Sequence, residues 1–291
     1  MTVKLLRLMP RNDQYDVYVE PFGGAASLLF AKPPRGMEVY NDLDSGLVDF
    51  YRLLRDPGRF EEFRRLVELT PYSREEFYRC LDTWQNQDNE VERARRWFVV
   101  ARMSFSGIFG GSWSHSVSSV CRDMSGAVSR WLGSIEMLPD FHRRLRRVQI
   151  EHQDWRVIIH RYDSDRTLFY VDPPYIHATR KSKHLYDNEM TDADHVDLVN
   201  TLLCVRGLCM LSGYQHDIYR ALDVEGWHRM DFRTACYAAG RTNASGIQGK
   251  GSALARAARV ESVWTNYTPA ESRQMDLPID WEHNAEGGTH G

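Results

Sequence analysis

The sequence has few cysteines and no long apolar run, and these two absences exclude several classes of protein. Five cysteines occur among 291 residues, and no two of them have the C-x-x-C spacing of zinc and redox sites. Their odd number argues against a disulfide framework, so we expect a protein of the reducing cytoplasm. No stretch reaches the roughly 18 apolar residues that a membrane helix needs, so we expect no membrane partner.

The sequence also lacks an excess of charge and several ligand-binding signatures. The net charge is -3, so attraction to nucleic acid must come from local patches. Neither the G-K-[ST] of phosphate loops nor the G-x-G-x-x-G of dinucleotide-binding folds is present. The 11 histidines show no H-E-x-x-H spacing, and we predict no metal site.

What is present is an alternation of strand and helix patterns, which predicts an α/β fold with a parallel sheet. The run 167–171 is apolar throughout, as in a strand covered on both faces. Thr191 with Asp194 three residues later predicts a helix start, and Gly207 its end. The predicted strands are residues 17–20, 37–40, 167–171, 208–212 and 261–265, and the other predicted helices are residues 25–32 and 43–54, the latter broken at Asp56-Pro57-Gly58.

Composition divides the chain into four parts. Residues 1–58 and 149–269 carry the α/β pattern, whereas residues 59–148 are Arg-rich, contain tryptophans and predict an inserted subdomain. Residues 270–291 are polar and aperiodic, which predicts a disordered tail. Residues 240–251 are rich in Gly, Ser, Thr and Asn and predict a mobile loop.

The strongest chemical signal is Asp172-Pro173-Pro174-Tyr175, which directly follows the strand 167–171. Ligands of open α/β sheets bind at that end of the strands. The Asp172 carboxylate and the Pro173 carbonyl could accept hydrogen bonds from a planar exocyclic amine, with φ fixed at both prolines. Tyr175 offers a face on which a base stacks, worth about 1–3 kcal/mol. The alternative is a rigid turn that only ends a buried strand.

A second candidate site follows the strand 17–20, where small residues let a ligand approach the backbone. Asp42 lies about 20 residues beyond Glu20, where an acidic group of nucleotide-binding folds accepts hydrogen bonds from ribose hydroxyls. The alternative for Asp42 is a helix cap, a role that Asp44 could also fill. Without a phosphate loop, a nucleoside cofactor is favoured over a dinucleotide. The residues of this turn are Glu20, Pro21, Phe22, Gly23 and Gly24.

In this order, these segments resemble the N6-adenine DNA methyltransferases that use S-adenosylmethionine, in their alpha arrangement. The resemblance covers residues 3–268 and implies a Rossmann-like methyltransferase sheet with an inserted, mainly helical target-recognition subdomain at 59–148. Residues 1–58 would then form the N-terminal part of the cofactor-binding domain, and residues 149–269 its catalytic part. The implied partner is DNA, methylated on a flipped-out adenine. A phage or bacterial modification enzyme is the implied context, with the restriction endonuclease partner left open.

The resemblance also implies roles for individual residues. Asp154, in Gln153-Asp154-Trp155, resembles the acidic residue that contacts the cofactor's adenine amine. Residues 211–214 fall where another family segment lies beside the catalytic strand. The implied cofactor-binding residues are Glu20, Pro21, Phe22, Gly23, Gly24, Asp42, Asp154 and Asp172, and those that hold the target base are Asp172, Pro173, Pro174 and Tyr175.

The chain departs from the family pattern at two places. Ala26 replaces the last glycine of F-x-G-x-G, a position that a small residue still fits. The family usually opens with a G-G-K motif before a helix such as residues 4–9, and this sequence begins after that point. An inactive relic that binds DNA or cofactor is therefore one alternative. Methylation of cytosine N4, RNA adenine or a protein amide is another, although the leading aspartate favours adenine and the Arg-rich insert favours nucleic acid.

Two basic clusters and one loop are the candidates for DNA contact. Basic clusters supply phosphate contacts, which position a protein without reading the sequence. The loop 104–113 is a candidate for insertion into a groove. The alternatives are ordinary solvated helix faces and a simple connector. The candidate residues are Arg93 and Arg96 near Trp97, Ser112 and Trp113 in the loop, and Arg143, Arg144 and Arg147 before the second α/β part.

Overall fold

The computed structural model describes residues 1–176, 189–235 and 258–269. The predicted loop 240–251 and tail 270–291 lie outside these residues. The described chain divides into two compact units, one formed by Met1–Arg55 with the segment that starts at Arg143, the other by Asp56–His142. Within the described residues, no helix is long and apolar enough to cross a membrane.

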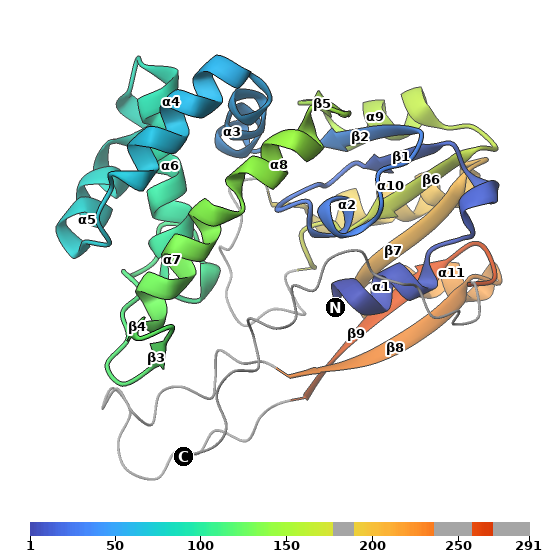
Figure 1. The fold of residues 1–291 in the computed structure, drawn as a ribbon. Coiled ribbons are helices and arrows are strands. Elements are labelled where there is room, and N and C mark those ends of the chain that lie inside the picture. The colour runs from blue at the N-terminus through green and yellow to red at the C-terminus, as the bar shows by residue number, and fades with distance from the viewer. Residues whose placement is uncertain (177–188, 236–257, 270–291) are drawn as a thin grey trace, which may run out of the picture. The chain divides into compact units, whose positions relative to one another are not determined.

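The first unit is built on a seven-stranded sheet with the strand order β5-β2-β1-β6-β7-β9-β8 (Figure 1). Five neighbouring strands are parallel, and β9 runs antiparallel to both β7 and β8. This mixed sheet confirms the predicted α/β fold. The strands are β1 (Val17–Glu20), β2 (Met37–Asn41), β5 (Val148–Glu151), β6 (Thr167–Val171), β7 (Leu208–Tyr214), β8 (His228–Ala235) and β9 (Ala258–Thr265).

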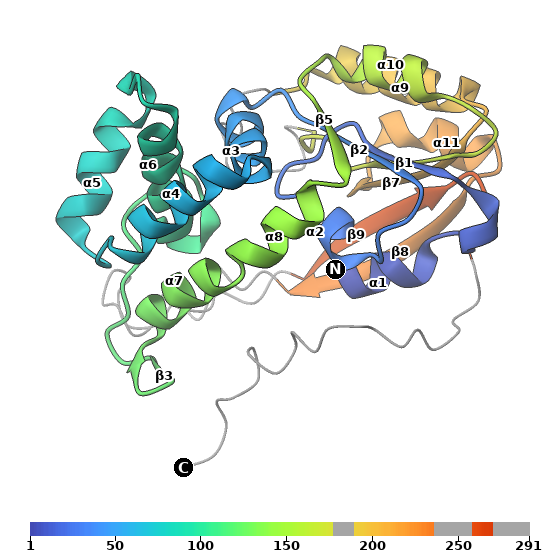
Figure 2. The same ribbon diagram turned by 45° about the horizontal axis from the view of Figure 1, so that its top comes forward.

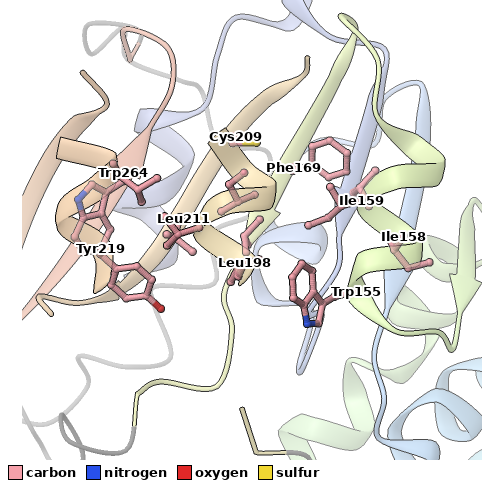
Figure 3. Packing of buried hydrophobic residues seen from close by; sticks show 14 of the residues in the cluster. Trp155, Ile158, Ile159, Phe169, Leu198, Cys209, Leu211, Tyr219 and Trp264 are labelled. Carbon is pink, nitrogen blue, oxygen red and sulfur yellow. The ribbon is translucent and has the colours of Figure 1, made fainter. Parts of the chain in front are cut away.

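Helices cover both faces of this sheet. Figure 2 shows α9, α10 and α11 on one face and α1 and α2 on the other. Under the first face, Trp155 and Leu198 pack with Phe169, Leu211 and Trp264 in one apolar core (Figure 3). All five residues of β6 are buried, as its uninterrupted apolar run predicted. The helices of this unit are α1 (Thr2–Leu8), α2 (Ser27–Ala31), α3 (Ser45–Arg55), α9 (Trp155–Tyr162), α10 (Asp192–Cys204) and α11 (Arg220–Val224), with 3-10 turns at Asn12–Gln14 and Asp217–Tyr219.

Helix starts follow the sequence signals more closely than helix ends do. Thr191 caps α10, since its hydroxyl accepts a hydrogen bond from the Asp194 amide and the Asp194 carboxylate accepts one from the Thr191 amide. The helix ends at Cys204, before the predicted terminator Gly207. At Pro57 the chain ends one helix and begins another, because a proline is tolerated in the first turn and Asp56 caps the Arg59 amide.

The second unit is mainly helical. The ring centroids of Phe63 and Trp131 each lie 5.6 Å from that of Phe98, so α6 carries the centre of its core. A short β3–β4 hairpin precedes α7. The elements are α4 (Pro57–Glu68), α5 (Arg74–Thr83), α6 (Glu90–Met103), β3 (Val120–Cys121), β4 (Met124–Ser125) and α7 (Gly126–Glu136), with 3-10 turns at Trp84–Asn86 and Phe105–Gly107, and α8 (Leu138–Leu145) crosses the division between the units.

Ala26 occupies a backbone conformation that favours glycine. Its φ is 52°, in the left-handed region, and its side chain is buried at the start of α2. A left-handed residue with a Cβ costs about 1–2 kcal/mol, whereas glycine loses about 0.5–1 kcal/mol more backbone entropy. Ala26→Gly is therefore expected to raise the free energy of unfolding in urea by about 0.5–1 kcal/mol. A destabilised variant would show that the Ala26 methyl group contributes more by packing than its conformation costs.

Candidate active site

The candidate site lies where β1 and β6 run side by side. The chain leaves β1 towards β2 on one side and leaves β6 towards β7 on the other, so the strand order reverses between them. Open α/β sheets bind their ligands at the carboxyl ends of the strands at such a point. Glu20 is the last residue of β1, and Asp172 directly follows β6. The two predicted sites therefore meet at one edge of the sheet.

Hydroxyl groups of neighbouring side chains hold the Asp172 carboxylate. Ser212 on β7 donates a hydrogen bond to Oδ1 at 2.8 Å, and Tyr170 donates one to Oδ2 at 3.3 Å. Burial raises the pKa of Asp172 to about 6, with a further rise from the charge of Glu261, while the Ser212 hydrogen bond lowers it. Asp172 is therefore mostly ionised at pH 7. It can accept a hydrogen bond, and its orientation is fixed before a substrate arrives.

Tyr175 is fixed at its hydroxyl and at its ring. The hydroxyl donates a hydrogen bond to Glu261 Oε1 at 2.9 Å, and the ring meets Tyr214 edge to face with centroids 4.7 Å apart. Burial, followed by the charges of Asp172 and Glu261, raises the pKa of Tyr175, so its hydroxyl remains a donor. Pro173 is buried, and Pro174 and Tyr175 are half-buried. The other three residues of the turn therefore form one ordered surface beside Asp172.

Glu20 is a buried carboxyl group with neutral hydrogen-bond donors. Only 1% of its surface is exposed, and the Tyr18 hydroxyl donates to its Oε1 at 2.6 Å. Burial raises the pKa of Glu20 to about 8, while the hydrogen bonds from Tyr18 and the Leu29 amide, and the charge of Lys32, lower it. Glu20 is therefore mostly protonated at pH 7. A cation bound beside it would favour the carboxylate.

Asp42 organises the glycine turn after β1. Its Oδ2 accepts a hydrogen bond from the Gly24 amide and its Oδ1 accepts one from the Asp44 amide, each at 2.8 Å. Asp44 caps the start of α3, because its Oδ1 accepts a hydrogen bond from the Leu47 amide at 3.2 Å. A Cβ on Gly24 would meet no atom within 4 Å, so the space beside this backbone is open. A Cβ on Gly23 would lie 2.1 Å from the Tyr40 ring, so close packing requires glycine there.

Asn41 joins this turn to the segment that contains Asp154. Its amide donates to the carbonyl oxygens of Pro21 and Gln153 at 2.8 and 3.0 Å, and its Oδ1 accepts from the Gln153 amide at 2.9 Å. Asp154 caps α9 by accepting from the Arg156 amide at 2.8 Å, and its Oδ2 pairs with the Arg156 side chain at 3.2 Å. The rings of Phe22 and Trp155 lie 5.9 Å apart. The predicted cofactor residues are thus brought to the same edge of the sheet.

Arg144, a candidate for DNA contact, lies in a buried ion-pair cluster. Its guanidinium group forms two hydrogen bonds with the Glu38 carboxylate and donates to the Leu29 carbonyl at 3.0 Å. Lys32 pairs with the same carboxylate. Burial raises the pKa of Glu38, but hydrogen bonds from Arg144 and the charge of Lys32 bring it below its usual value. This geometry fits a structural role for Arg144, whereas Arg143 and Arg147 are exposed.

The candidate arginines of α6 also have partners within the protein. Arg96 donates to Glu92 at 2.7 Å and to the Thr83 hydroxyl at 2.6 Å, and Arg93 donates to the Gln87 carbonyl at 3.4 Å. Arg95 is buried and pairs with Glu92 and with Glu76 on α5. These pairs hold α5 and α6 together. Part of this basic cluster therefore serves hydrogen bonds within the unit.

The exposed apolar residues of the loop 104–113 are not the residues that the sequence suggested for DNA contact. Ser112 is exposed, but Trp113 is half-buried and lies against Tyr72 and Arg74. The exposed apolar side chains are Phe105, Ile108 and Phe109. The signal that could have identified them was apolar residues within a Gly- and Ser-rich segment. Glu261 is a further residue of the site, and its place at the start of the predicted strand 261–265 carries no sequence signal for that role.

No group of three His, Cys, Asp or Glu side chains that could hold a metal ion occurs in the described part of the chain.

The sheet order, with one antiparallel strand, and the Asp-Pro-Pro-Tyr turn at the strand switch point fit the α/β class of methyltransferases. Residues 2–229 match the family model of the D12 class N6 adenine-specific DNA methyltransferases, and the chain belongs to this family. It is therefore an enzyme that methylates adenine in DNA, which confirms the family and the activity expected from the motifs. No finding favours cytosine, RNA or an inactive relic. No curated protein matches the chain.

Proposed function

We propose that this chain binds S-adenosylmethionine beside Glu20 and Asp42 and methylates N6 of an adenine held by the turn 172–175. The observation that carries the proposal is the Asp172 carboxylate, fixed by Ser212 and Tyr170 where the strand order reverses. The target base must leave the DNA stack, because its amine is out of reach within a duplex. Tyr175 then offers its ring for stacking.

The turn provides acceptors for the two hydrogens of the target amine. The lone pair of this nitrogen is delocalised into the purine ring, so the amine is a weak nucleophile. Asp172 and the Pro173 carbonyl would each accept one N–H, which draws the nitrogen towards tetrahedral geometry and directs its lone pair. Because the two proline rings fix φ, these acceptors need little reorganisation when the base arrives.

The residues of the glycine turn fit a charged nucleoside cofactor. The space beside Gly24 is open, and the Asp42 oxygens retain lone pairs for ribose hydroxyls. The buried Glu20 carboxyl group would gain a cationic partner. Asp154 would contact the cofactor's adenine amine, as its family counterpart does. S-adenosylmethionine supplies an electrophilic methyl group, and these residues bind and orient it.

DNA contact is proposed for exposed groups of each unit. Arg143 and Arg147 are exposed and suit phosphate contact. In the loop 104–113, the Ser112 hydroxyl suits a base edge, and the exposed apolar side chains suit a wedge between base steps. Trp113 would support this loop by packing, and Arg93 and Arg96 would contribute to the positive field of α6.

The experiment that tests this function is a methylation assay with S-adenosylmethionine on DNA, RNA and protein, read by mass spectrometry of the digested products. We expect N6-methyladenine in DNA at a defined sequence and no methylated product from RNA or protein. N4-methylcytosine, or methylated RNA without methylated DNA, would overturn the proposed substrate. Binding of cofactor without any product would support an inactive relic.

The buried carboxyl group of Glu20 predicts a pH-dependent cofactor affinity. The cation of the cofactor favours the carboxylate, so binding below pH 8 must release the Glu20 proton, whose pKa is about 8. Affinity should therefore rise with pH, by up to about 50-fold between pH 6 and pH 8, because about 1% of the free Glu20 is ionised at pH 6 and about half at pH 8. Calorimetry in buffers of different ionisation enthalpy measures both the affinity and the protons released.

Glu20→Gln is the matched control for this measurement. It keeps the shape of the side chain but has no proton to lose, so its affinity should lack the pH dependence contributed by Glu20. The α-amino group of the cofactor titrates near pH 8 as well. Because that group is present with both proteins, the difference between them isolates Glu20. Equal pH dependence in the variant and the wild type would assign the titration to the cofactor alone.

A further inference from the structure

Glu261 joins the catalytic turn from a strand outside the family match. The match ends at residue 229, and Glu261 lies on β9, which is inserted between β7 and β8. In the antiparallel β7–β9 pair, Glu261 is directly opposite Tyr214, the last residue of β7. Glu261 is half-buried, and its Oε1 accepts the hydrogen bond of the Tyr175 hydroxyl at 2.9 Å.

This register fixes Tyr175 by two contacts at neighbouring positions of the sheet. Tyr214 meets the Tyr175 ring edge to face, and Glu261 holds the hydroxyl at the far end of the same side chain. A carboxylate is a strong acceptor, and such hydrogen bonds are worth roughly twice those between neutral groups. The plane on which the target base would stack is therefore set from β7 and β9, and not by the turn alone.

Glu261 also places a negative charge near the Asp172 carboxylate. The titratable groups around Asp172 are Tyr170 on β6, Glu20 on β1, Tyr175 in the turn, Tyr219 before α11 and Glu261 on β9. Burial is the main cause that raises the pKa of Asp172 to about 6, and the Glu261 charge acts in the same direction. Removing that charge should lower the pKa of Asp172 and so extend its ionised range to lower pH.

We propose that Glu261 is a positioning residue of the methyltransferase, which orients Tyr175 through its hydroxyl and sets the charge environment of Asp172. This inference rests on the proposed function of the turn 172–175. Glu261 does not touch the reacting atoms, so its effect must pass through Tyr175 or Asp172. A purely structural role for Glu261 in β9 would affect neither the orientation of Tyr175 nor the charge environment of Asp172.

The first arm of the test is a double-mutant cycle between Glu261→Leu and Tyr175→Phe, read as kcat on DNA. Each single change breaks the same hydrogen bond and is expected to lower kcat by about tenfold or more, the range for hydrogen bonds to charged groups. The double variant should be no slower than the slower single variant. The dissociation constant for S-adenosylmethionine should stay unchanged in all three. Losses that multiply in the double variant would show that Glu261 does not act through Tyr175.

The second arm is Glu261→Gln, which retains a carbonyl acceptor for Tyr175 and removes the charge. Near pH 8, its kcat should return from the low value of Glu261→Leu to that of the wild type. The acid limb of its kcat–pH profile should lie about half a pH unit below that of the wild type. An unshifted acid limb would overturn the role of the charge. If Glu261→Leu does not fold, the double variant Glu261→Gln/Tyr175→Phe replaces it. Its acid limb should lie below that of Tyr175→Phe by the same half unit.

The controls separate this inference from the proposed function. Wild-type protein that fails to methylate adenine, or an active Asp172→Ala variant, would contradict the proposed function. An active wild type and an inactive Asp172→Ala variant, together with Glu261 variants that match the wild type in rate and pH profile, would overturn the role of Glu261 alone.

Discussion

Replacing Asp172 by alanine is expected to abolish methyl transfer and to leave the fold and cofactor binding largely intact. The side chain is half-buried at the end of β6 and accepts hydrogen bonds from Ser212 and Tyr170, so its removal leaves two hydroxyl groups that can bond to water or to each other. Losing the acceptor for the target amine should lower kcat by about 100- to 1,000-fold, the size of effect that one preorganised electrostatic group has in other enzymes. Single-turnover methylation of DNA measures this loss.

Asp172→Asn is the matched variant for this experiment. It keeps the shape and one acceptor oxygen but lacks the charge, so its rate should lie between those of the wild type and Asp172→Ala. In the wild type, the pKa of about 6 predicts that kcat falls below pH 6 as the carboxylate is protonated. The asparagine variant should lose this acid limb. Near-normal turnover in the alanine variant would remove Asp172 from the mechanism.

Replacing Arg144 by alanine is expected to destabilise the protein rather than to weaken DNA binding specifically. The change removes two hydrogen bonds from the buried Glu38 carboxylate and one from the Leu29 carbonyl. Removing one partner of a buried ion pair costs about 3–5 kcal/mol. Because Lys32 remains on Glu38, we expect a loss of about 3 kcal/mol in the free energy of unfolding by urea.

The exposed Arg147 supplies the comparison for Arg144. Arg147→Ala should change stability by less than about 0.5 kcal/mol, as is usual for surface positions. If Arg147 contacts a phosphate, its loss should also reduce the slope of log affinity for DNA against log salt concentration by about 0.9. The opposite pattern, with a stable Arg144→Ala and a reduced salt slope, would assign Arg144 to DNA contact.

Local signals made much of the fold and of the turn 172–175 predictable. The apolar run of β6 and the Thr191 cap are patterns within a few residues, and the structure has both. The meeting of Glu20 and Asp172 was predictable as well, because both follow parallel strands, and these ends share one edge of a sheet. The break at Pro57 was only half predicted, since a proline that ends one helix can begin the next.

Contacts between distant parts of the chain were not predictable in the same way. The partner of Arg144 is 106 residues away and that of Tyr175 is 86 residues away, so neither pair leaves a periodic pattern in the sequence. Arginines near one another in sequence looked alike as a basic cluster, but burial and acidic partners distinguish Arg144 from Arg147. Only the folded sheet shows which charges are neutralised inside the protein.

The position of β9 has a consequence for the order of folding during synthesis. Ala258–Thr265 lies between two strands that precede it in the chain, and Trp264 is buried in the core beneath them. While residue 265 is still inside the ribosome, the edge of β7 has no strand to pair with, and Tyr175 has no Glu261 beside it. The parallel strands can assemble earlier, as N-terminal regions usually do. The contacts of the turn 172–175 are therefore complete only after β9 has left the ribosome.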